Sequence, residues 1–281
     1  MVKKMEIMEI IKEAMVFPSK DLAKLAIYIV LAVVSGLLIG LGFVFVALGI
    51  ASEQALLSVL GVLLFIVGLV VVFIVGGYQV SIIKSGIGHV ESAPEFDWKG
   101  NLITGIKYLV VKIVYFIIPA IVVLIIAWAT NLFGMAQTMF TKMMVASMTA
   151  PANTTVVITD VVPQSMIISF GTAMAIVGVV AFVLFVIFAI IETMGVSRLA
   201  KTDSLGDALN IPEAFKDIGR IGFGKVIAVI LLIFVIIAVI NAVISGVNSY
   251  INGFSIISII VTPYLTFFAA RATGLLYSDI A

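Results

Sequence analysis

The sequence predicts an all-α membrane protein with six transmembrane helices arranged as three hairpins. Three observations predict this fold: the composition, the placement of the few charges, and the distribution of lysine and arginine along the chain. Of the 281 residues, 63% are hydrophobic and 11% are charged, and the mean hydropathy is +1.32. Soluble domains carry about 25% charged residues, and apolar surface in this excess is stable only where a lipid bilayer covers it.

The charged residues divide the chain into three long apolar blocks, at residues 25–83, 113–191 and 226–270. A membrane-spanning helix needs about 20 mostly apolar residues, so each block is long enough for two spans. We place the spans, within a single integral membrane domain of residues 1–281, at about 25–50, 55–83, 108–131, 166–194, 225–247 and 254–277.

Each block has a polar break near its middle, at Ala51–Gln54, at residues 131–165 and at Asn248–Gly253. The short first and third breaks predict tight helical hairpins. The strands of a membrane barrel would alternate apolar and polar residues, and these blocks do not. Helices are then the structure that satisfies the backbone inside hydrocarbon.

Lysine and arginine gather on one side of the predicted membrane. With these spans, 15 of the 16 Lys and Arg residues fall on one side, and Lys142 alone falls on the other. Basic residues of short loops favour the cytoplasmic side. We therefore expect a multi-pass protein of the cell (cytoplasmic) membrane with both termini in the cytoplasm.

A short amphipathic segment precedes each predicted hairpin. Lys20–Leu25 before the first and Lys216–Ile221 before the third have the same chemistry at every position. The second and third are led by similar motifs, Pro94-Glu95-Phe96-Asp97-Trp98 and Pro212-Glu213-Ala214-Phe215. We expect the proline to begin a helix, the acid to favour its positive N-terminal end and the phenylalanine to anchor in the membrane interface. These matches predict a threefold repeat of one cytoplasmic interfacial segment plus a hairpin.

One set of motifs resembles a known family. It consists of Gly77-Tyr78, Ile82-Ile83-Lys84, Ala93–Trp98, Gly105-Ile106-Lys107, Pro212–Phe215 and Gly274–Tyr277. Over roughly residues 15–278 the chain resembles the domain of unknown function 4013 family, uncharacterised multi-span membrane proteins found mainly in archaea. The resemblance implies an archaeal cytoplasmic membrane and carries no catalytic residues. The family usually has a second acidic residue before the tryptophan, where this chain has only Asp97, so no acidic-pair function is carried over.

Ionisable groups inside a membrane are costly and are therefore candidates for function. Glu192 and Arg271 lie near the same ends of the fourth and sixth spans. We expect that they can form an intramembrane ion pair, which either gates a path or locks the helices together.

The deeper polar residues are few, and each has two interpretations. Asn241 and Ser245 are four residues apart and share one face of the fifth span. Together with Thr172 and Pro263 they either line a solute path or hold helices together through hydrogen bonds. Gly36 and Gly40 form a small-xxx-small pair, which predicts close helix packing.

The loop between the third and fourth spans contains Met135, Met139 and Met143 at helical spacing. Thioethers bind Cu(I) in some proteins, but a methionine stripe more often packs, and we expect a packed surface helix. Asn153 begins an N-glycosylation sequon. The single histidine, His89, has no acidic or cysteine partners at ligand spacing, and we expect no metal or cofactor.

The sequence contains no cysteine, no Ser/His/Asp set and no zinc-protease motif. We therefore expect a protein that is not an enzyme. A net charge of +1 gives no basic field for nucleic acid, so the expected partners are the lipid bilayer and other membrane proteins. The leading hypothesis is a lipid-organising protein or an accessory subunit of a membrane complex; the alternative is a permease or channel for a small or lipidic solute.

Overall fold

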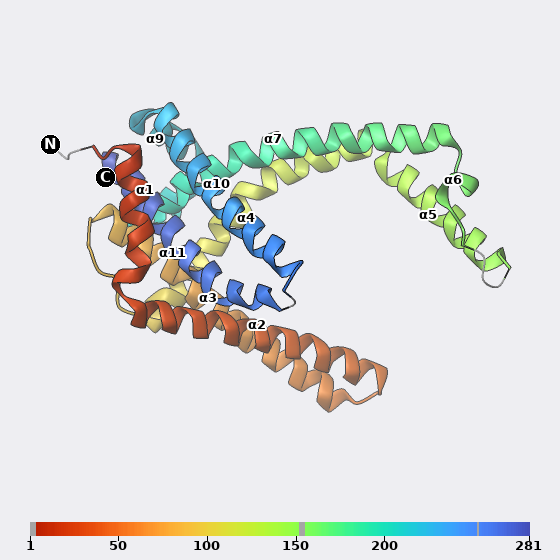
Figure 1. Ribbon diagram of the computed structural model, residues 1–281, viewed down its shortest axis with the longest axis horizontal. Coiled ribbons are helices and arrows are strands. Elements are labelled where there is room, and N and C mark those ends of the chain that lie inside the picture. Colours follow the sequence, from red (N-terminus) through yellow and green to blue (C-terminus); the bar gives the residue numbers. More distant parts are fainter. Residues whose placement is uncertain (1–3, 152–154, 252) are drawn as a thin grey trace. The chain divides into compact units, whose positions relative to one another are not determined.

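The computed structural model describes residues 4–151, 155–251 and 253–281, and every regular element within these ranges is a helix. Six helices are long and apolar enough to cross a membrane, as predicted (Figure 1). They are α2 (Leu22–Ala51), α3 (Ala55–Ile87), α4 (Trp98–Ala129), α7 (Gln164–Thr202), α10 (Phe223–Asn248), and a last helix made of η2 (Phe254–Ile257), α11 (Ser258–Tyr277) and η3 (Ser278–Ile280).

Short helices connect or precede the long ones. They are α1 (Ile7–Val16), η1 (Phe17–Lys20), α5 (Leu132–Thr149), α6 (Ile158–Val161), α8 (Leu205–Ala208) and α9 (Ile211–Ile221). Contacts divide the chain into two compact units. Unit 1 comprises residues 1–113 and 190–281, and unit 2 comprises residues 114–189. The single domain of 1–281 stays a prediction.

The α2–α3 hairpin of unit 1 is held by glycines spaced seven residues apart. Gly42 and Gly49 on α2 lie against α3, and Gly61 and Gly68 on α3 lie against α2. A Cβ atom at Gly42 would be 2.8 Å from the carbonyl oxygen of Gly61. Without hydrophobic driving force between helices in lipid, small residues favour association because they let the backbones approach closely.

The predicted packing role of Gly36 and Gly40 is wrong. A Cβ atom at either position would meet nothing within 4 Å. These two glycines lie on a different face of α2 from Gly42 and Gly49, so the heptad spacing of glycines, and not the small-xxx-small pair, marks the contact with α3.

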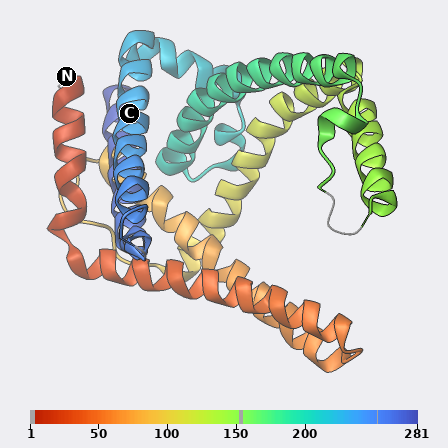
Figure 2. The same cartoon turned by 45° about the vertical axis from the view of Figure 1, so that its right-hand side comes forward.

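Helix α11 lies at the centre of unit 1, where it packs against α1, α2, α3 and α10 (Figure 2). Phe267, Phe268 and Leu275 are completely buried on it. Gly274 allows α11 to approach α3, because a Cβ atom there would be 2.2 Å from the carbonyl oxygen of Ile83. These contacts fix α11 as the helix around which the other elements of unit 1 are arranged.

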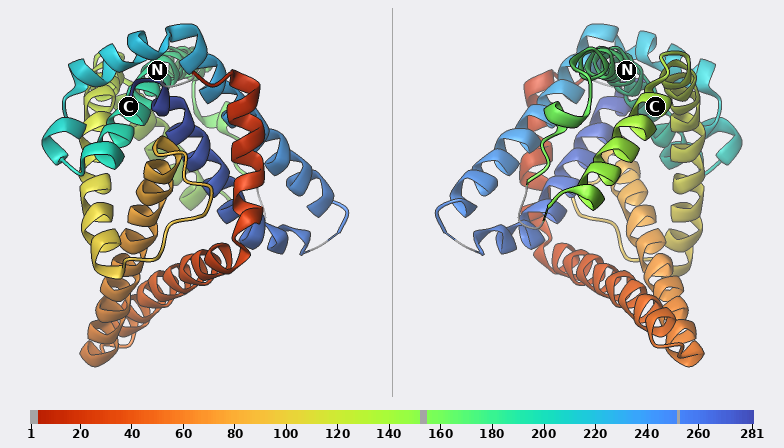
Figure 3. Two further views of the ribbon diagram at one scale, coloured as in Figure 1. Left: turned by 90° about the vertical axis from the view of Figure 1, so that its left-hand side faces the viewer. Right: turned by 90° about the vertical axis from the view of Figure 1, so that its right-hand side faces the viewer.

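The two ends of the described chain meet within unit 1 (Figure 3). The backbone amide of Met5 donates to Asp279 at 3.3 Å, and Lys225 at the start of α10 binds the same carboxylate. Met5 and Asp279 therefore lie at the same end of this unit.

Unit 2 has its own small core. Ala127, Leu132, Ala173 and Val177 are buried together, with Met135 packed against them. Phe116 and Phe185 stack with ring centroids 5.9 Å apart. The methionine-rich segment forms helix α5, as predicted from its spacing.

Candidate functional site

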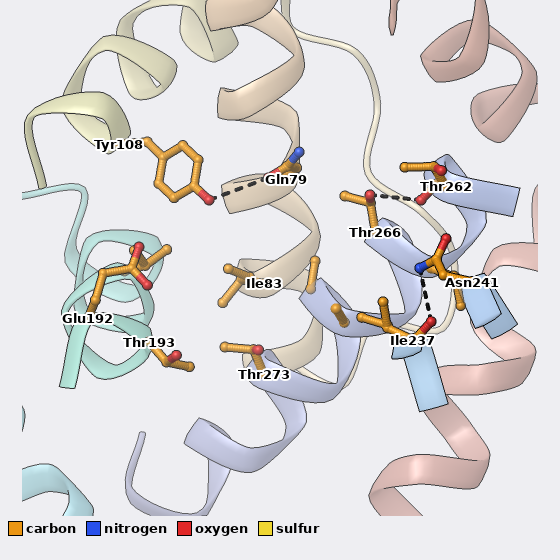
Figure 4. A pocket seen from close by; sticks show the side chains of 14 residues that line it. Gln79, Ile83, Tyr108, Glu192, Thr193, Ile237, Asn241, Thr262, Thr266 and Thr273 are labelled. Atoms are coloured by element: carbon orange, nitrogen blue, oxygen red, sulfur yellow. Dashed lines mark hydrogen bonds between the residues drawn. The ribbon is translucent and has the colours of Figure 1, made fainter. Parts of the chain in front are cut away.

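A cavity of about 330 Å³ lies within unit 1 among α3, α4, α7, α10 and α11 (Figure 4). Carboxyl and amide groups line it from three helices: Gln79, Glu192 and Asn241. Hydroxyl groups line it as well, from Tyr108, Thr193, Thr262, Thr266 and Thr273. The volume is at the lower end of the range for small-molecule sites.

One face of α11 forms a wall of this cavity. Thr262, Thr266, Ala269, Ala270 and Thr273 line it, at the spacing of one helical stripe. Their side chains are small, which leaves room between α11 and its neighbours. Thr266 donates its hydroxyl to the carbonyl oxygen of Thr262 at 2.9 Å, so the wall also offers hydroxyl oxygens as acceptors.

Gln79 connects two tyrosines inside this polar region. Its amide nitrogen donates to the Tyr28 hydroxyl at 2.6 Å, and its amide oxygen accepts a long hydrogen bond of 3.5 Å from Tyr108. Tyr28 is buried. The side chain of Gln79 is therefore held from α2 and from α4 at once.

Glu192 is the one charged residue among those that line the cavity. Its Oε1 atom is buried and has no hydrogen-bond partner among the described residues. It lies ten residues before the end of α7 at Thr202, which is about 15 Å of helix. Lys112 interacts electrostatically with Glu192. Its ammonium group, however, lies over the Tyr108 ring, 4.6 Å from the ring centroid.

A second cavity, of about 550 Å³, adjoins the first. Gln79, Thr262 and Thr266 line both cavities. The second extends toward the start of α11, where Ser258 and Ile259 line it, and the first extends toward Thr273 near the end of α11. The two cavities thus follow α11 along most of its length, with Gln79 between them.

The expected ion pair between Glu192 and Arg271 is not formed. Arg271 is 1% exposed and donates instead to the Glu13 carboxylate of α1, to the Val90 carbonyl oxygen at 2.7 Å and, at 3.4 Å, to the Ser85 hydroxyl. The physical reason is that α1 packs against α11. This brings Glu13 to Arg271, while Glu192 belongs to the cavity.

The other predicted polar residues separate into different surroundings. Asn241 lines the cavity, and its amide donates to the Ile237 carbonyl oxygen of its own helix at 2.9 Å. Ser245, one turn further on, is exposed and does not line this cavity. Pro263 is buried and lines the second cavity. Thr172 lies in unit 2, where its hydroxyl donates to Ile168 within α7.

Sequence reasoning missed Gln79, Tyr108, Thr193, Thr266 and Thr273. The sequence of α11 does contain a pattern that predicts this wall, because small and hydroxyl-bearing residues recur at helical spacing from Thr262 to Thr273. Gln79 and Tyr108 gave no comparable signal, since one polar residue in an apolar helix fits packing as well as a cavity.

The Pro94–Trp98 motif caps α4 and stacks on α3. Asp97 accepts a hydrogen bond from the Gly100 amide at 3.0 Å, so α4 begins at Trp98, and Pro94 lies before the helix. Phe96 stacks on Tyr78 with ring centroids 3.8 Å apart and planes 3° apart, and the Tyr78 hydroxyl donates to the Pro94 carbonyl oxygen at 2.8 Å. Pro94 therefore does not begin the helix as expected, and Phe96 contacts the protein.

Glu95, in the same motif, forms an ion pair of 2.8 Å with Lys24 at the start of α2. Lys24 also donates to the carbonyl oxygen of Ala93 at 2.7 Å. The motif thus connects the beginning of the first hairpin to the beginning of α4.

The Pro212–Phe215 motif follows the expected pattern more closely. Pro212 lies in the first turn of α9, Glu213 is the acid of that turn, and Phe215 is 48% exposed. A hydrogen bond from Lys216 lowers the pKa of Glu213, and Arg220 contributes to the same effect. The motif therefore begins a helix here, unlike its counterpart before α4.

Asp217 of α9 is buried and connects the helix to the rest of unit 1. It accepts hydrogen bonds from Arg198 at 2.9 Å, from Arg220 at 2.7 Å and from the Tyr277 hydroxyl at 2.9 Å. Asp21, its counterpart in the predicted repeat, likewise pairs with the basic residue three positions later, Lys24, at 3.2 Å. The two acids share this local contact, although Asp21 caps α2 and Asp217 lies inside α9.

On α5, Met139 is 9% exposed, which agrees with the expected packing role of the methionines. Met148, near the end of the same helix, is 73% exposed and does not pack. Asn153 lies outside the described residues. His89 lies two residues beyond the end of α3 at Ile87 and has a left-handed conformation, with φ of 52°. Among the described residues, no group of three or more His, Cys, Asp or Glu side chains could hold a metal ion.

The six long apolar helices of the described residues define an all-α, multi-pass membrane protein. The chain belongs to the family described as "Protein of unknown function (DUF4013)", whose model matches residues 60–249. No curated protein and no solved structure matches the chain.

Proposed function

We propose that this protein is a permease or channel for a small solute, which occupies the two adjoining cavities along α11. The observation that carries this proposal is the pair of adjoining cavities that share Gln79, Thr262 and Thr266. Substrate sites of membrane transporters lie between the spans, where a few polar groups meet in an otherwise apolar environment.

The sequence favoured a lipid-organising protein or an accessory subunit over a permease. A solute path requires polar side chains that converge, and Asn241 supports this because it lines the same cavity as Glu192 and Gln79. Thr172 and Ser245 lie elsewhere and add nothing to the path. The convergence of three polar residues from three helices supports the permease over the accessory subunit.

The site also supports a function without covalent catalysis. Its lining contains one carboxylate and lacks histidine, the side chain that most often performs general acid–base catalysis. We accordingly assign binding and passage of a solute, and no bond-breaking reaction.

We place the protein in the archaeal cell (cytoplasmic) membrane with both termini in the cytoplasm. The lysine and arginine distribution supports this orientation, and the contact between Met5 and Asp279 supports a common side for the two ends. The lipid bilayer is the immediate partner, and nucleic acid is not one.

A lipid-organising or accessory role is the second candidate, and helix α9 favours it. Its exposed side carries Phe215, Lys216 and Arg220, a combination of aromatic and basic residues typical of helices that lie in a membrane interface. In that role the cavities would be spaces between loosely packed helices.

Native mass spectrometry of the protein, gently extracted from its own membrane, distinguishes the two candidates. The permease predicts a retained small molecule that is lost in Asn241→Leu and kept in Ser245→Leu, a matched change one turn away on α10. A stoichiometric protein partner, with no small molecule in either variant, would instead support the accessory subunit.

A further inference from the structure

The carboxylate of Glu192 distinguishes this cavity from a purely hydroxyl-lined space between helices. The Oε1 atom is buried without a hydrogen-bond partner among the described residues, although a buried acceptor normally has a donor. A carboxylate is a strong acceptor, and leaving it unpaired is costly. A hydrogen-bond donor that enters the cavity and reaches this carboxylate would remove the cost.

The neighbouring protein groups do not supply this donor. The Tyr108 hydroxyl points to the amide oxygen of Gln79. The Lys112 ammonium lies over the face of the Tyr108 ring, and it forms no ion pair with Glu192 in the part of the chain that the structure describes. A donor that enters the cavity can thus reach Glu192 without displacing a salt bridge.

The other residues that line the cavity indicate the chemistry of the rest of the ligand. Glu192 and Tyr108 lie toward one end of the lining residues, and Asn241 and Thr262 lie toward the other (Figure 4). Ile83, Val196, Leu265 and Ala270 contribute apolar surface to the lining. This lining fits a small molecule with a charged head and a short apolar body.

Resting on the proposed function, we infer that the solute carries a primary ammonium group, which binds the Glu192 carboxylate, on a short aliphatic body. An ammonium group presents three donors and forms charge-assisted hydrogen bonds, which are about twice as strong as neutral ones. An anionic solute would meet the carboxylate of Glu192 and would be repelled.

Binding of three matched probes to the purified full-length protein in lipid nanodiscs tests this inference. The probes are n-butylammonium, 1-butanol and butyrate, which share an aliphatic chain and differ in charge. We expect n-butylammonium to bind and butyrate not to bind. Glu192→Gln should weaken n-butylammonium binding by about tenfold or more, because it removes the charge from the acceptor. Glu53→Gln, which removes an acid from the loop between α2 and α3, should leave binding unchanged.

A second variant keeps the test decisive if Glu192→Gln is unstable. Glu192→Asp keeps the carboxylate and should still bind n-butylammonium in preference to 1-butanol, whereas a structural role for Glu192 predicts no such preference. Equal binding of n-butylammonium and 1-butanol, unchanged in Glu192→Gln, would overturn the ammonium assignment and leave the proposed solute site intact. Binding of no probe, together with no retained small molecule in native mass spectrometry, would overturn both.

Discussion

The buried guanidinium of Arg271 on α11 is paired with Glu13 on α1, a residue 258 positions earlier in the chain. The Arg271 guanidinium also lies over the ring of Phe17, 4.6 Å from its centroid. The Tyr264 hydroxyl adds a second connection to the same segment by donating to the Met15 carbonyl oxygen at 2.7 Å. The N-terminal helix is thus an integral part of the packing around α11.

Glu13→Gln should destabilise the protein because it leaves Arg271 buried without its counter-charge. Removing one partner of a buried ion pair costs about 3–5 kcal/mol, and we expect the low end of this range because Glu13 is 31% exposed. Thermal unfolding in detergent measures the loss. Lys12→Gln, which removes an exposed charge from the same helix, is the matched control. A transition temperature equally unchanged in both variants would contradict the pairing.

The glycine contact between α2 and α3 predicts opposite outcomes for two neighbouring substitutions. Gly42→Ala places a methyl group 2.8 Å from the carbonyl oxygen of Gly61, and overpacking of this kind costs about 1–3 kcal/mol. Gly40→Ala adds the same methyl group in open space and should be neutral or slightly stabilising, because alanine favours helix. Unfolding measurements that rank the two variants the other way would exclude this arrangement of the hairpin.

The stack of Phe96 on Tyr78 predicts a measurable coupling between the family motif and α3. A double-mutant cycle with Phe96→Leu and Tyr78→Leu should give a coupling energy of about 0.5–1.5 kcal/mol. Phe215 of α9, which is 48% exposed, provides the control, and Phe215→Leu combined with Tyr78→Leu should be nearly additive. Additivity in both cycles would mean that Phe96 does not depend on Tyr78.

The absence of cysteine from the sequence makes the orientation simple to test. A single cysteine at Ser52, in the turn between α2 and α3, should react with a membrane-impermeant thiol reagent added outside the cell. A single cysteine at Ser204, between α7 and α8, should react only after the membrane is opened. The reverse pattern would place the two termini outside.

The long helices could be predicted from the sequence because hydropathy alone determines them. The first and last residues of these helices were predicted less closely. Helix α4 begins at Trp98, ten residues before the predicted span, because Asp97 caps it there. The site was predicted only in part. Asn241 lines the cavity, as one of its two interpretations required, but Glu192 lines the cavity too and does not pair with Arg271. The rotation of each helix about its own axis decides which polar side chains meet. A single polar residue in an apolar helix does not reveal that rotation.

If a solute occupies the cavities along α11, water must reach them, and cysteine accessibility measures this most directly. Thr266→Cys lines both cavities, and in proteoliposomes it should react with a small, water-soluble methanethiosulfonate. Phe182→Cys, at a position 72% exposed on the apolar part of α7, should stay unreactive because lipid covers it. Reaction of Thr266→Cys alone is the result that a solute site predicts, and equal lack of reaction at both positions would contradict it.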